Sequence, residues 1–329
     1  MQSTATTTTA DVYHAMLRTS FVPAHPEEGN QQQETGIKTL TLNINDAFRE
    51  EKVPGFEFKK RLPDILALIL EQKPDVLFLV EVTQTEHRNL LVFELTNMGF
   101  RVIYGERNAS PGCTANLIAF DPARFQLTKT ENIQLLSDDA ELPGDTSMIN
   151  GWGANLFVAH VLLSQNNKVV VPKRELVLGA THFPIHEASR QACTEAIRLW
   201  LENHEKHRYI VSGDLNTFHD KGGPGQIAKL REVATVEGET SICHVTGRKV
   251  LGTYFGYPHD RFCFDVDKFL DPLDYVITNP AFATFAGPLH TDTRFIPAKA
   301  QEDAPIGTRA PLVYASDHLP LIARINLTL

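Results

Sequence analysis

The chain twice leads a helical segment into an apolar run that ends near an acidic side chain. The run at residues 76–80 (VLFLV) is followed at once by Glu81, and the run at 209–211 (YIV) leads through a Ser-Gly step to Asp214. A short apolar run bounded by turn residues is typical of a buried strand. Two such units predict two halves whose sheets pack together, with an acid at the same end of each.

The two preceding segments have the apolar period of helices with one buried face. The first is residues 58–72, where a proline is tolerable in the first turn and Lys73-Pro74 ends the pattern. The second is residues 187–205. The side chains predicted to face inward are Leu62, Ile65, Leu66, Ile69 and Leu70 in the first helix, and Ala192, Ala196, Leu199 and Trp200 in the second.

Asp214 and Asn216 stand two residues apart directly after a predicted strand. Alternate side chains of an extended segment point to the same face, so the carboxylate and the amide can reach one spot. This combination suits metal or phosphate chemistry, although Gly-Asp after a strand is also ordinary turn chemistry.

Polar residues of catalytic types recur at six places where predicted strands end. Reacting groups gather at strand ends and the loops beyond them, so this recurrence favours one shared site. Oxygen donors without clustered thiols favour Mg²⁺ or Mn²⁺ over Zn²⁺. The residues are Asn43, Glu81, His182, Asp214 with Asn216, Asp274, and Asp317 with His318.

Three further patterns have a structural interpretation beside a functional one. Asn45 is either a turn residue or a second metal ligand. His182 and His186 have the H-x₃-H spacing of a zinc pair, but the Phe-Pro between them prevents a regular helix. The glycine-rich segment 222–225 lacks the following Lys-Ser/Thr of a P-loop and is interpreted as a loop.

Composition separates the start of the chain from the rest. Residues 1–36 are rich in Thr, Pro, Glu and Gln and are predicted to form a disordered tail. Residues 37–329 are predicted to form one domain. No run approaches the roughly 18 apolar residues of a membrane span, and no signal-peptide pattern is present. A cytoplasmic protein with no obligate protein partner is therefore expected, with signal-independent export left open.

The charge balance argues against tight non-specific DNA binding. The chain has 31 Lys and Arg and 40 Asp and Glu, a net charge of −9, whereas proteins that grip long nucleic acid are usually basic. A metal-dependent enzyme remains open because a bound cation offsets clustered carboxylates. The 4 cysteines are widely spaced and predict reduced thiols.

Six motifs, in order, resemble those of the endonuclease/exonuclease/phosphatase superfamily, whose fold is DNase I-like. The resemblance covers residues 38–327 and implies an α/β (α+β) fold, a two-layer β-sandwich flanked by helices. The motifs are LNIN at 42–45, PDVLFLVEV at 74–82, THF at 181–183, GDLN at 213–216, LDYV at 273–276 and SDHLPL at 316–321.

The resemblance implies a bound Mg²⁺ or Mn²⁺ and a water that attacks a phosphoester. Glu81 is implied as the main metal-binding carboxylate, helped by Asn43 and Asp317. Asp214 is implied to orient or deprotonate the attacking water, with Asn216 contacting the phosphate beside it.

Two histidines are implied to contact the phosphate. His318 is expected to be held in its tautomer by Asp274, as acid–His pairs generally are. His182 stands where abasic-site endonucleases usually have a tyrosine, and this difference separates the chain from them. The reaction implied is in-line attack of water, catalysed mainly by positioning and electrostatics.

Substrate choice in this superfamily depends on loops outside the motifs. Tyr254 and Phe255 belong to an aromatic segment that could stack a base, or equally pack on the sheet. Arg190 is a candidate phosphate contact or a solvent-facing residue. The Trp-Cys-Asp-Arg motif of inositol-polyphosphate 5-phosphatases is replaced here by Pro-Leu-Asp-Tyr at 272–275, which makes that activity less expected.

The leading hypothesis is a Mg²⁺-dependent phosphoesterase that cleaves a phosphodiester of a nucleic acid end or nucleotide conjugate. The alternative is a phosphomonoesterase or a phospholipid or inositol-phosphate phosphatase of the same fold. A third hypothesis, a catalytically inactive binding module, is disfavoured because the residues of every motif are intact.

Overall fold

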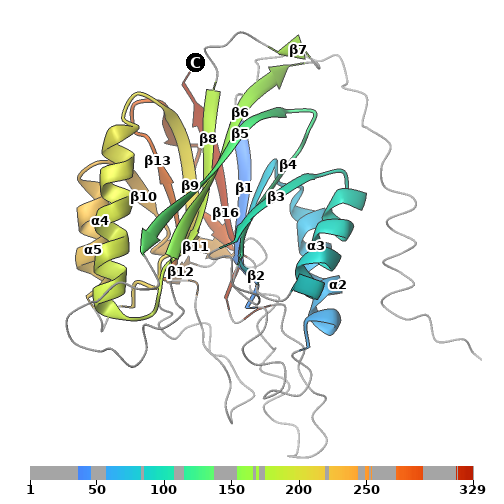
Figure 1. Cartoon of the computed structure of the whole chain (residues 1–329), viewed down its shortest axis with the longest axis horizontal. Coiled ribbons are helices and arrows are strands. Elements are labelled where there is room, and N and C mark those ends of the chain that lie inside the picture. Colours follow the sequence, from blue (N-terminus) through green and yellow to red (C-terminus); the bar gives the residue numbers. More distant parts are fainter. Residues whose placement is uncertain are drawn as a thin grey trace, which may run out of the picture.

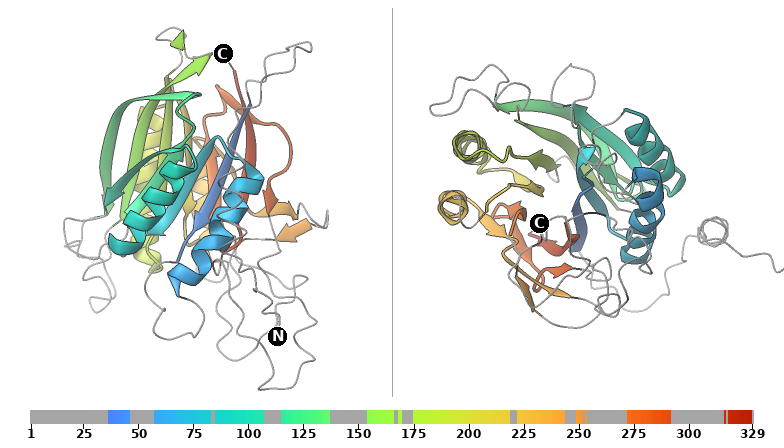
Figure 2. Two further views of the ribbon diagram at one scale, coloured as in Figure 1. Left: turned by 90° about the vertical axis from the view of Figure 1, so that its right-hand side faces the viewer. Right: turned by 90° about the horizontal axis from the view of Figure 1, so that it is seen from below.

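Two β-sheets pack face to face and helices cover their outer faces (Figures 1 and 2). This arrangement confirms the predicted two-layer α/β sandwich. None of the described helices has the length and apolar character needed to cross a membrane. The structure is a computed structural model that describes residues 36–45, 57–82, 85–106, 115–136, 154–165, 168–169, 175–218, 222–243, 249–251, 253, 272–291, 316 and 318–328.

The first sheet is built around a parallel pair at its centre. Its strands are β1 (Gly36–Asn43), β2 (Val76–Val82), β3 (Arg101–Glu106), β4 (Ala115–Phe120), β11 (Thr240–Cys243), β12 (Lys249–Leu251), β14 (Ala283–Phe285), β15 (His290–Thr291) and β16 (Leu321–Leu327). Their order is β12-β11-β15-β16-β1-β2-β4-β3, with β14 beside β16. β1 runs parallel to β2 and antiparallel to β16.

The second sheet contains the other predicted helix-to-strand unit. Its strands are β5 (Phe125–Leu136), β6 (Ala154–Gln165), β8 (Glu175–His182), β9 (Arg208–Asp214), β10 (Thr235–Glu237) and β13 (Asp274–Thr278), and β7 (Lys168–Val169) pairs with β6. Their order is β10-β13-β9-β8-β6-β5. Because β2 and β9 lie in different sheets, the two acids that end the apolar runs come from opposite layers.

The four described helices bury one face each against a sheet. They are α2 (Phe58–Gln72), α3 (Thr85–Asn97), α4 (Glu187–Asn203) and α5 (Gly223–Arg231). α2 and α3 lie on the first sheet, whereas α4 and α5 lie on the second (Figure 1). In α4 the buried positions include Cys193, Ile197 and Leu201. The prediction for Leu199 was wrong: it is 47% exposed, because it lies about 200° around the helix from Ile197.

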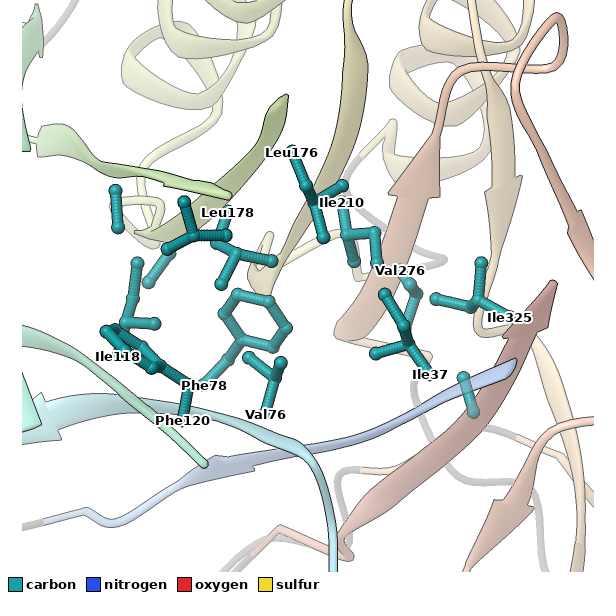
Figure 3. Packing of buried hydrophobic residues seen from close by; sticks show 14 of the residues in the cluster. Ile37, Val76, Phe78, Ile118, Phe120, Leu176, Leu178, Ile210, Val276 and Ile325 are labelled. Atoms are coloured by element: carbon teal, nitrogen blue, oxygen red, sulfur yellow. The ribbon is translucent and has the colours of Figure 1, made fainter. Parts of the chain in front are cut away.

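The space between the sheets is filled by a fully buried apolar cluster (Figure 3). β2 shows how one strand serves two layers. Val76 and Phe78 belong to this central cluster, while Leu77 and Leu79 belong to the cluster under α2. An apolar side chain at every position is what a strand covered on both faces requires.

Several short strands were not predicted from the sequence. They are β10, β11, β12, β14 and β15, of two to four residues each. The last, β15, begins at His290. Three predicted features lie outside the described residues: positions 1–35 of the predicted tail (1–36), the aromatic segment with Tyr254 and Phe255, and Asp317. The last residue of the predicted tail, Gly36, begins β1.

Gly213 permits β8 and β9 to stay paired as far as the end of the sheet where His182 and Asp214 lie. Its φ is +155°, and a Cβ at this position would lie 1.8 Å from the carbonyl oxygen of Thr181. The pairing continues for one more residue, where His182 stands opposite Asp214. Only glycine combines this backbone angle with so close an approach.

Gly213→Ala should therefore destabilise the protein by at least about 3 kcal/mol, because the methyl group meets backbone rather than a movable side chain. Gly225→Ala is the control, since a Cβ there meets nothing within 4 Å and alanine favours the α5 helix. Urea unfolding measures both variants. Equal stability of Gly213→Ala and wild type would show that the β8–β9 pairing tolerates a side chain at this point.

Candidate active site

Three neighbouring strands of the second sheet deliver polar side chains to one end of the sandwich. The register pairs His182 with Asp214 across β8 and β9, and Asp274 with Asp214 across β13 and β9. Paired residues point to the same face of a sheet. The apolar neighbours two residues earlier or later, such as Ala180 and Val276, belong to the central cluster, so all three polar side chains face the first sheet.

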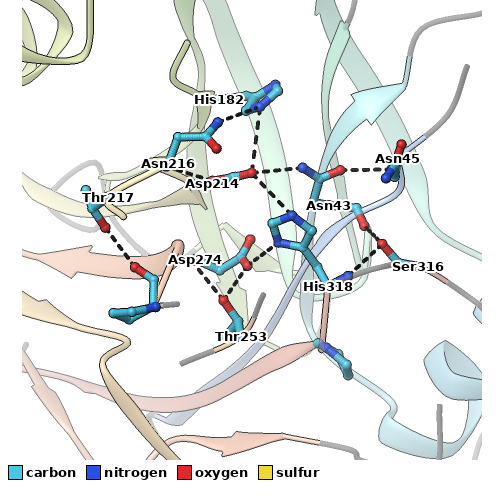
Figure 4. A network of polar contacts seen from close by, with 12 residues as sticks. Asn43, Asn45, His182, Asp214, Asn216, Thr217, Thr253, Asp274, Ser316 and His318 are labelled. Atoms are coloured by element: carbon cyan, nitrogen blue, oxygen red, sulfur yellow. Dashed lines mark hydrogen bonds and ion pairs between the residues drawn. The ribbon is translucent and has the colours of Figure 1, made fainter. Parts of the chain in front are cut away.

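The strand opposite, β1, becomes polar at the same end. Thr41 Oγ1 lies 2.6 Å from Ser212 Oγ, and Asn43 Nδ2 donates to Asp214 Oδ2 at 2.9 Å (Figure 4). These two hydrogen bonds join β1 to β9 across the sandwich. The interior of the protein thus changes from an apolar core to a polar network along a single pair of strands.

Asp214 lies at the centre of this network (Figure 4). Its Oδ1 accepts the backbone N–H of Asn216 at 2.7 Å, and its Oδ2 lies 3.6 Å from His318 Nε2 and 3.7 Å from His182 Nε2. The residue is only 1% exposed. This carboxylate faces donors and imidazoles from both sheets.

Burial raises the pKa of the Asp214 carboxyl well above its usual range, and the nearby Asp274 carboxylate raises it further. His318 and the hydrogen bonds from Asn43 and Asn216 act in the opposite direction and favour the carboxylate. A carboxyl group whose pKa is raised toward neutrality is better suited to accept a proton than an ordinary surface carboxylate.

Asn216 connects β9 to the segment that follows β8. Its φ is 50°, in the left-handed region that asparagine tolerates better than most residues. Its Nδ2 donates to the carbonyl of Phe183 at 2.7 Å and lies 3.2 Å from His182 Nε2. The side chain therefore fixes His182 relative to Asp214.

His318 is oriented by Asp274, which is itself hydrogen-bonded to Thr253. Its Nδ1 lies 2.7 Å from Asp274 Oδ2, which leaves Nε2 directed toward Asp214. Thr253 donates its hydroxyl to the same Asp274 oxygen at 2.6 Å and accepts the Asp274 backbone N–H at 3.1 Å. Because a carboxylate accepts the Nδ1 proton, the tautomer and the ring orientation of His318 are fixed together.

Glu81 lies at a β-bulge at the end of β2. The register with β4 shifts between Leu79 and Val82, although both of these residues pack under the helices. Glu81, between them, is half-buried and has a φ of 61°. A bulge releases a side chain from the strict alternation of the strand and redirects it, and such bulges are common beside active sites.

The two other predicted residues, Arg190 and Asn45, make contacts that involve the backbone. Arg190 is fully buried, and its guanidinium donates to the carbonyl of Ile185. It thus holds the segment after His182, and a contact with substrate stays a prediction. Asn45 has a φ of 46° and donates its backbone N–H to Asn43 Oδ1 at 2.8 Å, as a turn residue does.

Sequence reasoning missed three residues that support the site. Thr253 is one. Ser316 donates to the Asn43 carbonyl at 2.6 Å and accepts the His318 backbone N–H at 3.2 Å. Arg61, fully buried, donates to the carbonyls of Ile44 and Asn45. Ser316 was within a recognised motif, but nothing in the helical pattern distinguishes Arg61 from a surface arginine.

The donors available for a cation fit Mg²⁺ or Mn²⁺. Glu81 supplies a carboxylate and Asn43 an amide oxygen, and Mg²⁺ is usually held by one or two carboxylates together with water and phosphate oxygens. Among the described residues no cluster of three or more His, Cys, Asp or Glu forms a metal site, so the zinc pairing of His182 with His186 gains no support. The third expected ligand, Asp317, lies outside them.

The sequence model of the Endonuclease/Exonuclease/phosphatase family matches residues 40–318. The fold and the polar strand ends thus define a phosphoesterase-type α/β sandwich, and this chain belongs to the Endonuclease/Exonuclease/phosphatase family. None of the curated protein sequences compared with it matches.

Solved structures share the fold at low sequence identity. An endonuclease/exonuclease/phosphatase from Bacteroides vulgatus is 15% identical with a TM-score of 0.64, covering 89% of this chain and 99% of that one. Bacteroides thetaiotaomicron mannosyl-6-phosphatase is 14% identical with a TM-score of 0.60, covering 89% and 100%. D. rerio TDP2 complexed with single strand DNA product is 16% identical with a TM-score of 0.51, covering 88% and 99%.

Thr253→Val should lower the free energy of unfolding by about 1–3 kcal/mol, because the buried Asp274 carboxylate loses a hydrogen-bond donor. Thr253→Ser keeps the hydroxyl and should stay closer to wild type. Thermal and urea unfolding of the two variants make the comparison. Equal losses for valine and serine would contradict the assignment to the hydrogen bond, because serine keeps the hydroxyl that donates it.

Proposed function

We propose that this protein is a divalent-metal-dependent phosphodiesterase that hydrolyses a nucleic acid end or a nucleotide-type substrate by in-line attack of water. The observation that carries the proposal is the buried Asp214 carboxylate, with two imidazoles 3.6 and 3.7 Å from its Oδ2. A proton acceptor beside two groups that can contact phosphate oxygens matches the needs of phosphoester hydrolysis.

The division of roles follows from the contacts of each residue. Asp214 accepts the proton of the attacking water, since burial raises its pKa toward the working range. His318 directs Nε2 into the site because Asp274 accepts from Nδ1. Asn216, whose Nδ2 lies 3.2 Å from His182 Nε2, keeps His182 close to Asp214. Fixed donors of this kind stabilise the charge that develops on the phosphate oxygens without reorganising.

Glu81 and Asn43, with Asp317, are the residues proposed to hold the cation. Mg²⁺ or Mn²⁺ would polarise a phosphoryl oxygen and stabilise the leaving oxygen. Asn43 would then have two functions, because its amide nitrogen also orients Asp214.

The diester is favoured over the monoester by the charge of the described site. The polar network of described residues around Asp214 contains no Lys or Arg, and the buried arginines beside it, Arg61 and Arg190, donate to backbone carbonyls. A monoester dianion needs more positive charge than a diester monoanion. Fold relatives include both a mannosyl-6-phosphatase and a TDP2 with a DNA product, so likeness alone does not choose between the two.

Asp214→Asn should lower turnover by about 10²–10⁴-fold, the contribution typical of a positioned proton acceptor. The assay is a panel with Mg²⁺ or EDTA: abasic and 5′-adducted DNA, short RNA, nucleotide conjugates, inositol phosphates and sphingomyelin. The control is Asp75→Asn, whose carboxylate accepts the Lys38 backbone N–H at the far end of the first sheet and should keep full turnover.

The outcomes of this panel separate the hypotheses. Mg²⁺-dependent cleavage of a diester supports the proposal. Release of phosphate from monoesters alone replaces it with the phosphatase alternative. Absence of turnover on every substrate, with no binding of Mg²⁺, supports a binding module.

Glu81→Gln should weaken Mn²⁺ binding by at least about tenfold, because the neutral amide loses the charge that attracts the cation. Isothermal titration with MnCl₂ in the absence of substrate measures this directly. Glu205→Gln, on the exposed turn after α4, is the matched control and should bind as wild type does. Unchanged affinity in Glu81→Gln would remove Glu81 from the proposed metal site.

A further inference from the structure

Besides β1 and β9, a second pair of strands, β4 and β6, is joined by a polar bridge across the sandwich at the same end as the active-site network. Asn116 on β4 donates its amide to Asn155 on β6, at 3.0 Å to Oδ1 and 3.2 Å to the backbone carbonyl. Both residues are 3% exposed. Asn155 in turn donates to Asn132 Oδ1 and accepts the Thr181 hydroxyl at its carbonyl. Neither asparagine belongs to a recognised motif.

The strand registers place this bridge beside the site. On the second sheet Leu156 pairs with Thr181, so one residue further Asn155 stands opposite His182. On the first sheet Leu79 pairs with Leu117 and Val82 with Ala115, so Asn116 stands opposite the bulge formed by Val80 and Glu81. Each asparagine is therefore the lateral neighbour of a strand end that contributes to the active site.

The two bridges lie on either side of the ends of β2 and β8, and the interval between these two strand ends is called the gap. Val80 also pairs with Asn43, and His182 also pairs with Asp214. The Asn43–Asp214 hydrogen bond therefore lies on one side of the interval between the end of β2 at Val80–Glu81 and His182. The Asn116–Asn155 hydrogen bond lies on the other side. The gap between the bridges is where, under the proposed function, the cation and the phosphate lie.

We propose that Asn116 and Asn155 are positioning residues that fix the spacing between Glu81 and His182. Apolar packing alone holds the sheets together but is non-directional, so it leaves small rotations of one sheet on the other inexpensive. A single bridge fixes one point of contact. Two bridges on either side of the gap fix the distance across it. This inference rests on the proposed function for its catalytic consequence, but not for its structural one.

The first test compares turnover with stability. Bis(p-nitrophenyl) phosphate with Mn²⁺ is the substrate for wild type, Asn116→Ala, Asn155→Ala and the double variant. We expect kcat to fall by at least about tenfold in each single variant, as for outer residues that orient a metal site, with KM changed less than twofold. The double variant should lose no more than the single variants, because the two residues act as one unit.

The matched control is Asn279→Ala. Asn279 is 4% exposed and donates its amide to the carbonyls of Glu205 and His207, beyond the opposite end of β13. The Asn279→Ala variant loses buried amide hydrogen bonds as the Asn116 and Asn155 variants do. Its melting temperature should fall by a similar amount, but its kcat should equal that of wild type. If Asn155→Ala fails to fold, Asn132→Ala is the substitute, because it removes the exposed side chain whose Oδ1 accepts from Asn155. It should lower kcat by a smaller factor.

The second test needs no turnover. With ¹⁵N-labelled histidine at one fixed pH, the His182 imidazole signals should shift or broaden in Asn116→Ala and Asn155→Ala and remain unchanged in Asn279→Ala. If the wild-type protein does not hydrolyse bis(p-nitrophenyl) phosphate, that result contradicts the proposed phosphodiesterase activity. The NMR comparison of the His182 signals still decides the positioning role in that case. The positioning role would be overturned if Asn116→Ala and Asn155→Ala both showed the His182 signals of the wild-type protein and, where bis(p-nitrophenyl) phosphate is hydrolysed, an unchanged kcat.

Discussion

The hydrogen bond from Asn43 to Asp214 couples the two layers of this protein at the proposed active site. A carboxylate that is 1% exposed is costly to bury, and it is tolerated only where donors satisfy it. One donor is the Asn216 backbone N–H from its own sheet, and the other comes from the opposite sheet. The separation of the sheets at this end is therefore set by the reach of an amide to a carboxylate, and the other site residues are arranged around that contact.

The polar end depends on the apolar end of the same strands. β1 contributes Ile37 to the central cluster and β9 contributes Ile210, while four to six residues further along each strand the side chains become Asn43 and Asp214. Apolar burial supplies most of the stability of such a domain, and polar networks contribute specificity at a cost. A strand that is anchored at one end can present strained or buried polar groups at the other. Three of the four described non-glycine residues with positive φ, Asn45, Glu81 and Asn216, lie at these polar ends.

The sequence predicts the features that follow from apolar periodicity and from the order of motifs. It does not predict the features that depend on how one strand or helix is aligned with its neighbours. Strand ends with acids, amides and histidines were visible because each follows an apolar run. The bulge at Glu81 was not, because it exists only relative to β4. Arg61 was hidden for a similar reason: its helix position is ordinary, and only the packing of α2 brings its guanidinium to the carbonyls after β1. Leu199 shows the opposite error, an apolar residue assigned to the core although the buried face of α4 lies elsewhere.

The proposed positioning role of the two cross-sheet bridges also accounts for how a sandwich built from distant segments would keep the geometry of the proposed site. Apolar contacts between sheets tolerate sliding and rotation, since their energy depends on buried area and little on angle. Hydrogen bonds are directional and lose strength steeply when bent. Asn43–Asp214 restricts translation of the sheets at one strand pair, and Asn116–Asn155, two strands away in each sheet, restricts rotation about that point. Residues from both layers can then meet a small phosphate group with fixed spacing, which a single bridge would not guarantee.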